Sequence, residues 1–215
     1  MELMDLAIFL DTGANYFVIV PLCLGFFYFK HISVLLKILL FGLVLTLLQL
    51  IILKILNINS SFIFGYILAC VDTIMVTLLI SQNITSRINR NIFLTIGLLL
   101  LIFIFIDSQY ITCLNNFGIS TFVVKIFIVI SAFITLNHLF KINLETEIFE
   151  QPIIWICFGL IFNNLLGSFE MFSLAIMNYS QNLVLQYYML LAFVRIVMYL
   201  FFSYSFYLSQ KIENN

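Results

Sequence analysis

The sequence predicts an all-α polytopic membrane protein with a single domain over residues 1–215, and three observations lead to this fold class. Of the 215 residues, 64% are hydrophobic and only 9% are charged, whereas a soluble domain carries about 25% charged residues. The apolar residues form seven long runs, too continuous for the alternating pattern of an outer-membrane barrel. Basic residues gather beside alternate turns, as in multi-span membrane proteins. The lipid bilayer is therefore the predicted surroundings.

The seven apolar runs define the predicted transmembrane helices. A bilayer core of about 30 Å needs roughly 20 helical residues at about 1.5 Å each. The first and fourth runs are short, and we expect these helices to extend into their flanks. Pro21 lies in the first run and predicts a kink there. The predicted helices are residues 14–29, 34–56, 62–80, 92–106, 119–140, 153–177 and 183–208.

The orientation of the helices follows from the distribution of basic residues. Cationic side chains are enriched in cytoplasmic loops of membrane proteins. Lys54 alone lies on the other side of the predicted helices. The pattern therefore predicts an N-terminus outside and a C-terminus in the cytoplasm. The basic residues on the predicted cytoplasmic side are Lys30, Lys37, Arg87, Arg90, Lys141 and Lys211.

Four ionisable residues lie within the predicted helices. Helical rise places Asp72 and Arg195 about 15 and 18 Å from the outer ends of their helices. Lys125 and Glu170 lie about 9 and 10 Å from theirs. Matching depths predict that Asp72 pairs with Arg195 and that Lys125 pairs with Glu170. Two amides, Asn163 and Asn164, complete the predicted intramembrane polar cluster.

This polar cluster has two interpretations. In the first, the charged residues line a cavity that binds a ligand or passes an ion, because intramembrane ionisable residues are usually functional. In the second, the charges form two buried ion pairs that fix how the helices pack, and Asn163 and Asn164 form hydrogen bonds between helices. The full balance of two acids and two bases favours the second. The sequence leaves both open.

Motifs for other classes of chemistry are absent from the sequence. The net charge of −1 provides no basic face for a nucleic acid. The four cysteines have none of the close CxxC spacing of a metal site. Neither HExxH nor GxSxG nor a glycine-rich phosphate loop is found. We therefore expect a non-enzymatic protein without a metal or cofactor.

An internal repeat is a further hypothesis. Helices one to three would correspond to helices five to seven, with the fourth as a linker that carries few polar residues. Both halves would then have the same orientation, as in parallel-repeat transporters. Alignment by the outer ends of the helices matches Gln49 with Glu170 and Asp72 with Arg195. The side-chain identities do not repeat convincingly in this alignment.

The segment Gln151–Ser168, QPIIWICFGLIFNNLLGS, carries a resemblance to a known family. Pro152, Trp155 and Gly159, followed by a polar patch, resemble the sixth helix of a family of small uncharacterised bacterial membrane proteins. These proteins have seven helices and are often encoded near sensor histidine kinases. The resemblance implies a role in signalling or sensing, with a histidine kinase as the partner. This sequence differs in its last helix, where Arg195 replaces the histidine and asparagines expected.

These observations lead to three functional hypotheses for a protein of the bacterial inner membrane. The first is a sensory or accessory component of a membrane signalling system. The second is a small-solute or ion transporter built on the three-one-three helix plan. The third is a structural subunit of a larger membrane complex. Water-accessible passage through the polar cluster would separate the second hypothesis from the others.

Overall fold

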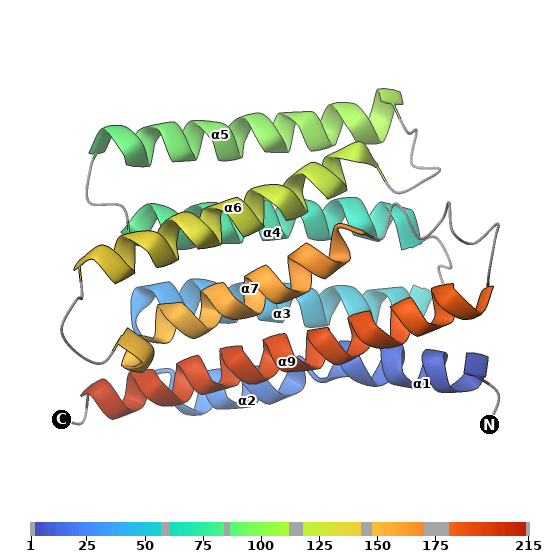
Figure 1. The fold of residues 1–215 in the computed structure, drawn as a ribbon, viewed down its shortest axis with the longest axis horizontal. Helices are drawn as coiled ribbons and strands as arrows, with labels where there is room; N and C mark the ends of the chain where they lie inside the picture. The colour runs from blue at the N-terminus through green and yellow to red at the C-terminus, as the bar shows by residue number, and fades with distance from the viewer. Residues whose placement is uncertain are drawn as a thin grey trace.

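The computed structural model describes residues 3–56, 61–83, 87–111, 118–142, 148–169 and 181–213, and these segments are helical almost throughout. Six helical spans are long and apolar enough to cross a membrane, and a shorter apolar helix begins at Pro152. The chain is therefore an all-helical, multi-span membrane protein (Figure 1). Its elements are α1 (Leu3–Tyr16), α2 (Ile19–Phe27), α3 (Val34–Leu56), α4 (Ser61–Asn83), α5 (Arg87–Ile106), η1 (Asp107–Ile111), α6 (Ile119–Ile142), η2 (Ile148–Glu150), α7 (Pro152–Gly167) and α9 (Gln181–Glu213).

Each of the seven predicted helices corresponds to a helical span of the structure, and the ends differ most in the first, fourth, sixth and seventh. The fourth begins at Arg87 and the seventh ends at Glu213. The first span begins at Leu3, well before the predicted start, and comprises α1 and α2. The fourth does not end at Ile106, because the chain continues as the π-helix η1 to Ile111. The sixth, α7, ends at Gly167. The predicted continuation of the sixth helix to Met177 lies outside the described residues.

Six of the seven spans form a closed ring, and α5 lies outside it. Around the ring the neighbours are α1 with α2, then α3, α4, α6, α7 and α9, which packs back against α1 and α2. Helix α5 packs against α4 and α6 only at one edge, as Figure 1 shows. Its side chains are largely exposed and apolar, including Leu98, Leu99 and Phe105. Such a surface suits contact with lipid.

The first span is interrupted at Phe17 and Val18, which form a turn between α1 and α2. Proline has no N–H, and its ring crowds the carbonyl four residues earlier. For Pro21 that carbonyl belongs to Phe17, which instead accepts a hydrogen bond from the N–H of Val20 at 3.0 Å. The kink predicted from Pro21 is therefore present, as a break that separates two half-helices.

The ring consists of two layers of three spans. One layer holds α1/α2, α3 and α4, and the other holds α6, α7 and α9 (Figure 1). If α1/α2 is matched with α6, α3 with α7 and α4 with α9, the contacts within the two layers correspond. The α2–α3 and α3–α4 contacts match α6–α7 and α7–α9, and the α1–α9 contact between layers matches α6–α4. Corresponding spans also run in the same direction along the bundle. The arrangement thus has an approximate two-fold axis between α3 and α7, parallel to the helices.

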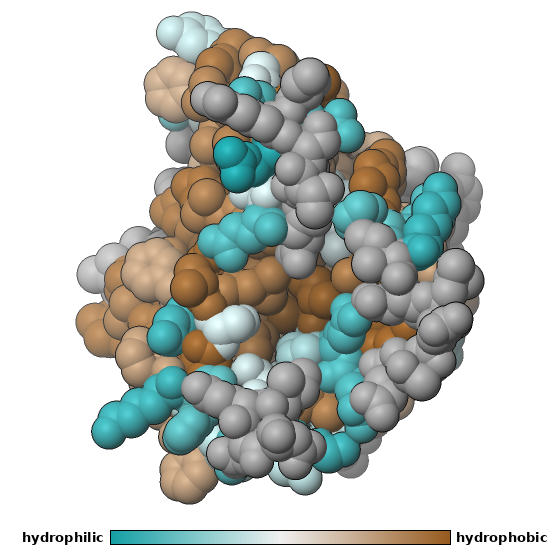
Figure 2. Space-filling model, turned by 90° about the vertical axis from the view of Figure 1, so that its left-hand side faces the viewer, coloured by the Kyte–Doolittle hydropathy of each residue, from teal (hydrophilic) through white to brown (hydrophobic). Residues whose placement is uncertain are grey.

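The end of the bundle that carries the C-terminus is held by polar contacts between α9 and its neighbours. Ser205 donates a hydrogen bond to the carbonyl of Pro152 at 3.0 Å, and Ser209 to that of His31 at 3.2 Å. Lys211 forms an exposed ion pair with Glu150 at 3.0 Å. Figure 2 views this end, where hydrophilic side chains surround a hydrophobic centre.

Candidate functional site

A polar cavity of about 280 Å³ lies between the two layers. All six ring spans contribute to its described lining, and α5 does not. The lining positions extend from the middle of the spans towards the end of the bundle that carries the N-terminus. The polar and charged residues that line it are Asn15, Thr46, Gln49, Asp72, Thr121, Lys125, Asn163, Asn164, Arg195 and Tyr199.

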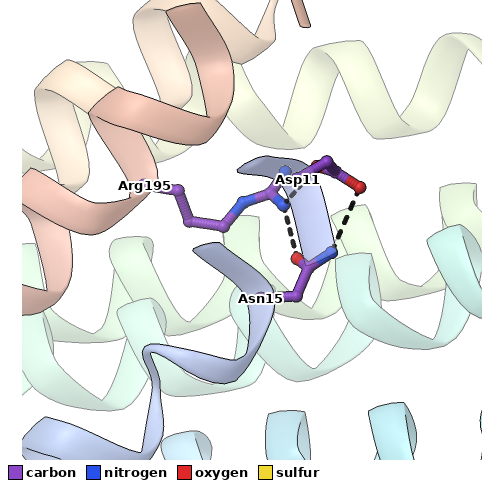
Figure 3. Close-up of polar contacts among 3 residues, drawn as sticks. All are labelled: Asp11, Asn15 and Arg195. Atoms are coloured by element: carbon purple, nitrogen blue, oxygen red, sulfur yellow. Dashed lines mark hydrogen bonds and ion pairs between the residues drawn. The ribbon is translucent and has the colours of Figure 1, made fainter. Parts of the chain in front are cut away.

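Arg195 is held at the cavity wall by two residues of α1. Its guanidinium Nη1 lies 3.1 Å from Asp11 Oδ1 and also donates a short hydrogen bond to Asn15 Oδ1. Asn15 Nδ2 donates in turn to Asp11 Oδ2 at 3.3 Å, since the two residues are one helical turn apart. Figure 3 shows the resulting three-residue cluster, which joins α9 to α1. The charge of Arg195 is thus balanced by Asp11 of α1, the half-helix that precedes the break.

The predicted ion pair between Arg195 and Asp72 is replaced by this contact with Asp11. Both residues line the cavity, as their matched depths suggested. However, α1 packs directly against α9, so Asp11 lies nearer to the guanidinium. The prediction missed Asp11 because the first apolar run was taken to begin at Ala14, which left Asp11 outside the span.

Lys125 reaches across the cavity wall from α6 to the end of α7. Its ammonium donates a hydrogen bond to the carbonyl of Gly167 at 2.9 Å. The last carbonyls of a helix lack intrahelical partners and carry partial negative charge, so a cation there is favourable. A Cβ on Gly167 would lie 3.3 Å from the ammonium nitrogen, so the glycine leaves room for this approach.

The carboxylate of Asp72 lines the same cavity from α4. Within the described part of the chain, no group forms a hydrogen bond or an ion pair with it. Lys125 and Asp72 are close enough to interact electrostatically, but the ammonium of Lys125 is directed to the Gly167 carbonyl. A carboxylate at membrane depth is costly unless a cation, water or a proton compensates it. Asp72 is therefore the lining charge that remains available to a ligand.

The other members of the predicted cluster differ in their positions. Asn163 and Asn164 both line the cavity, and Asn164 donates a hydrogen bond to the carbonyl of Leu160 within its own helix at 2.9 Å. This bond lies within α7, so it is not the contact between helices that the sequence suggested for Asn164. Glu170, with its predicted pairing to Lys125, lies outside the described residues. The cavity therefore brings together Asp72, Lys125, Asn163, Asn164 and Arg195.

The lining residues of the two layers correspond to one another along the sequence. Helices α3 and α7 share the sequence Phe-Gly-Leu at positions 41–43 and 158–160. Asp72 aligns with Arg195 when residues 68–75 of α4, LACVDTIM, are matched with residues 191–198 of α9, LAFVRIVM. The close contact of Gly42 with Met75 recurs as that of Gly159 with Met198. Identities therefore repeat in these two pairs of spans, in a register that alignment of helix ends did not reveal for α3 and α7.

The first spans of the two halves also correspond, through their buried positions rather than their identities. With Asn15 aligned to Lys125, five buried residues of the first span align with five buried residues of α6. They are Ala14, Val18, Pro21, Leu22 and Gly25 in the first span and Val124, Ile128, Ser131, Ala132 and Thr135 in α6, which also buries Ser120, Val129 and Leu136. The cavity is thus built from equivalent positions of two halves, but the charges at those positions differ.

One buried acid was not identified from the sequence. Asp107 was assigned to a loop, yet it lies in η1 and has no exposed surface. Its Oδ2 accepts a hydrogen bond of 2.8 Å from the N–H of Ser120 in the first turn of α6. A carboxylate in this position caps a helix and complements its dipole. Asp107 does not line the cavity, so its role is to fix the junction of α5 and α6.

Comparisons with known proteins identify no relative of this chain. No family model matches, and neither a curated protein nor a solved structure shows significant similarity.

Proposed function

We propose that this protein is a membrane carrier that binds a small polar solute in the cavity between its two halves. The observation that carries the proposal is the polar cavity to which all six ring spans contribute. Small-molecule sites are concave and have a few polar groups among apolar walls. With a volume of about 280 Å³, this cavity matches the lower end of such sites, near 300 Å³.

The repeat supports transport rather than binding alone. Parallel-repeat transporters place their site between two halves, and the halves move relative to one another around it. Here the α1–α9 and α4–α6 contacts join the two layers at their edges. Helix α1 is also a half-helix, since the span breaks at Phe17, and discontinuous helices are typical of transporter sites. Movement of the two halves that opens one end of the bundle at a time would expose the cavity to alternate sides.

The proposed setting is the inner membrane of a bacterium, with the N-terminus outside. The C-terminal end of the bundle carries most basic residues, including Lys30, Lys37, Arg90 and Lys141, and Lys54 lies towards the other end. Basic residues favour the cytoplasmic side. The polar cavity would then be nearer to the outer face.

Cysteine accessibility tests the carrier proposal. In a cysteine-free background, Thr46→Cys places a thiol at the cavity and Leu98→Cys places one on the exposed face of α5. A membrane-impermeant thiol reagent is applied to right-side-out and inside-out vesicles. We expect Thr46→Cys to react from both sides and Leu98→Cys to react from neither.

The other hypotheses give different results in the same experiment. Reaction of Thr46→Cys from the outer side only would contradict transport and support a sensor, consistent with signalling through a partner such as a histidine kinase. The absence of any reaction would mean a closed, packed interior and support a structural subunit. If Thr46→Cys reacts from the outer side only, the next measurement is whether a kinase is recovered with the protein from native membranes.

A further inference from the structure

We propose that the solute carries a protonated amine and that Asp72 binds it; this inference rests on the proposed function of the cavity. The argument begins with the charges at the cavity wall. Three charged side chains of the described chain line it, namely Asp72, Lys125 and Arg195. Both cations donate to acceptors of the protein, whereas the described residues include no hydrogen-bond donor or ion-pair partner for the carboxylate of Asp72. The complement that the cavity lacks is therefore a positive charge.

The acceptors of the two cations are supplied by neighbouring spans. Arg195 contacts Asp11 and Asn15 of α1, and Lys125 contacts the Gly167 carbonyl at the end of α7. An anionic solute would compete with these acceptors for the two cations and would also meet the carboxylate of Asp72. A cationic solute leaves these contacts in place. Charge complementarity thus favours a cation over an anion in this cavity.

The walls around Asp72 indicate an organic cation rather than a metal ion. Met75, Met198, Tyr199 and Phe202 line the cavity together with Asp72. Tyr199 is close enough to interact electrostatically with both Asp72 and Arg195. Aromatic faces attract ammonium groups, and methionine adapts to apolar groups of varied shape. A hard metal ion instead prefers several oxygen ligands, and the described residues contain no cluster of three or more metal-ligating side chains.

The two edges between the layers differ in how the charges of Asp72 and Arg195 are compensated. Asp72 and Arg195 occupy corresponding places in the repeat, and so do Lys125 and Asn15. At the α1–α9 edge Arg195 is neutralised by Asp11 of the other half, whereas at the equivalent α4–α6 edge the residue corresponding to Asp11 is Thr121. One edge therefore holds an ion pair between the two halves, and the other leaves the carboxylate of Asp72 for the solute.

Ligand-dependent thermal stability of the purified full-length protein tests this inference. The probes are ethanolamine and phenethylamine, compared with the neutral isosteres ethylene glycol and phenethyl alcohol, and with sodium chloride at the same ionic strength. Binding to the folded state raises the unfolding temperature. We expect a rise with at least one amine, none with its neutral isostere, and a dissociation constant at least about tenfold weaker for Asp72→Asn.

Two variants keep the test interpretable. Asp72→Glu retains the charge and should recover part of the affinity, so a folding defect of Asp72→Asn cannot be mistaken for lost recognition. Glu150→Gln removes an exposed acid at the opposite end and should leave amine binding unchanged. Equal stabilisation by the amine and its isostere would overturn the inference, as would sodium alone producing the Asp72-dependent shift.

The two proposals fail in different experiments. Asp72-dependent binding of an amine with access to Thr46→Cys from one side only would leave this inference standing and remove the carrier. Access to Thr46→Cys from both sides with no Asp72-dependent binding of amines would leave the carrier proposal standing and remove the amine site.

Discussion

The guanidinium of Arg195 lies 3.1 Å from the carboxylate of Asp11, which joins the middle of α9 to the half-helix that precedes the break in the first span. The two residues are far apart in the sequence, and neither is fully buried, with side-chain exposures of 28% and 45%. Asn15 contacts both partners. The position of α1 against α9 therefore depends on a polar contact as well as on packing.

The first prediction concerns the energy of this contact. In a double-mutant cycle, Asp11→Ala and Arg195→Ala should show a coupling free energy of about 1 kcal/mol, between the values for exposed and buried pairs. Reversible unfolding in mixed detergent micelles measures it. A parallel cycle with Asp72→Ala and Arg195→Ala should give a smaller coupling. Strictly additive losses for Asp11 and Arg195 would show that the contact contributes nothing to stability.

A second prediction concerns Lys125 and the end of α7. Lys125→Met keeps much of the side-chain length but leaves the Gly167 carbonyl without its charged donor. We expect a loss of about 1.5–3 kcal/mol in unfolding free energy, as for hydrogen bonds to charged groups. Lys125→Arg keeps a charged donor and should retain part of this stabilisation. Faster hydrogen exchange at the last turn of α7 in Lys125→Met would locate the effect, and unchanged exchange there would contradict it.

The contact of α7 with α9 leads to a third prediction. A Cβ on Gly159 would lie 3.3 Å from the backbone oxygen of Met198 and 3.0 Å from the ring of Phe202. Gly159→Ala should therefore destabilise the protein by about 1–3 kcal/mol through overpacking. Gly13→Ala is the matched control, because a Cβ there has nothing within 4 Å. The control should be neutral or stabilising by up to about 1 kcal/mol. Equal effects of both substitutions would refute the packing argument.

The break in the first span gives a fourth prediction. Pro21→Ala restores an N–H that can bond the Phe17 carbonyl and removes the steric cause of the turn. We expect amide hydrogen exchange between Phe17 and Leu22 to slow by roughly tenfold, which corresponds to about 1.4 kcal/mol of added helix stability. If α1 must move during transport, solute uptake into vesicles should slow as well. Unchanged exchange would mean that tertiary contacts, rather than proline, cause the break.

Much of the fold could be predicted from the sequence because lipid imposes long apolar runs. The predicted bounds of residues 34–56 coincide with those of α3. Where the prediction failed, polar residues continued a helix beyond its apolar run. Asp11 belongs to α1, and Asp107 belongs to η1, although both were placed outside the helices. Apolar runs locate spans well, but they underestimate helices that carry polar residues.

The candidate site could be predicted only in part. Helical depth placed Asp72 and Arg195 near one level and Lys125 nearer to the outer end, and the structure places all three at one cavity. Depth could not decide their partners, since that depends on which spans are neighbours. The Gly167 carbonyl that Lys125 contacts is a backbone group, which no side-chain pattern indicates. The resemblance to bacterial signalling proteins, the absence of catalysis and the location in the inner membrane stay predictions.

The position of α5 outside the ring has a consequence for how such a chain could arise. A unit of three spans begins on one side of the membrane and ends on the other. Two such units joined directly would therefore insert in opposite directions. One additional crossing restores the direction, and α5 provides it while contributing no described residue to the cavity. A duplicated three-helix ancestor would have needed α5 to give both halves the same orientation. The sequence of α5 could then vary without changing the lining of the cavity.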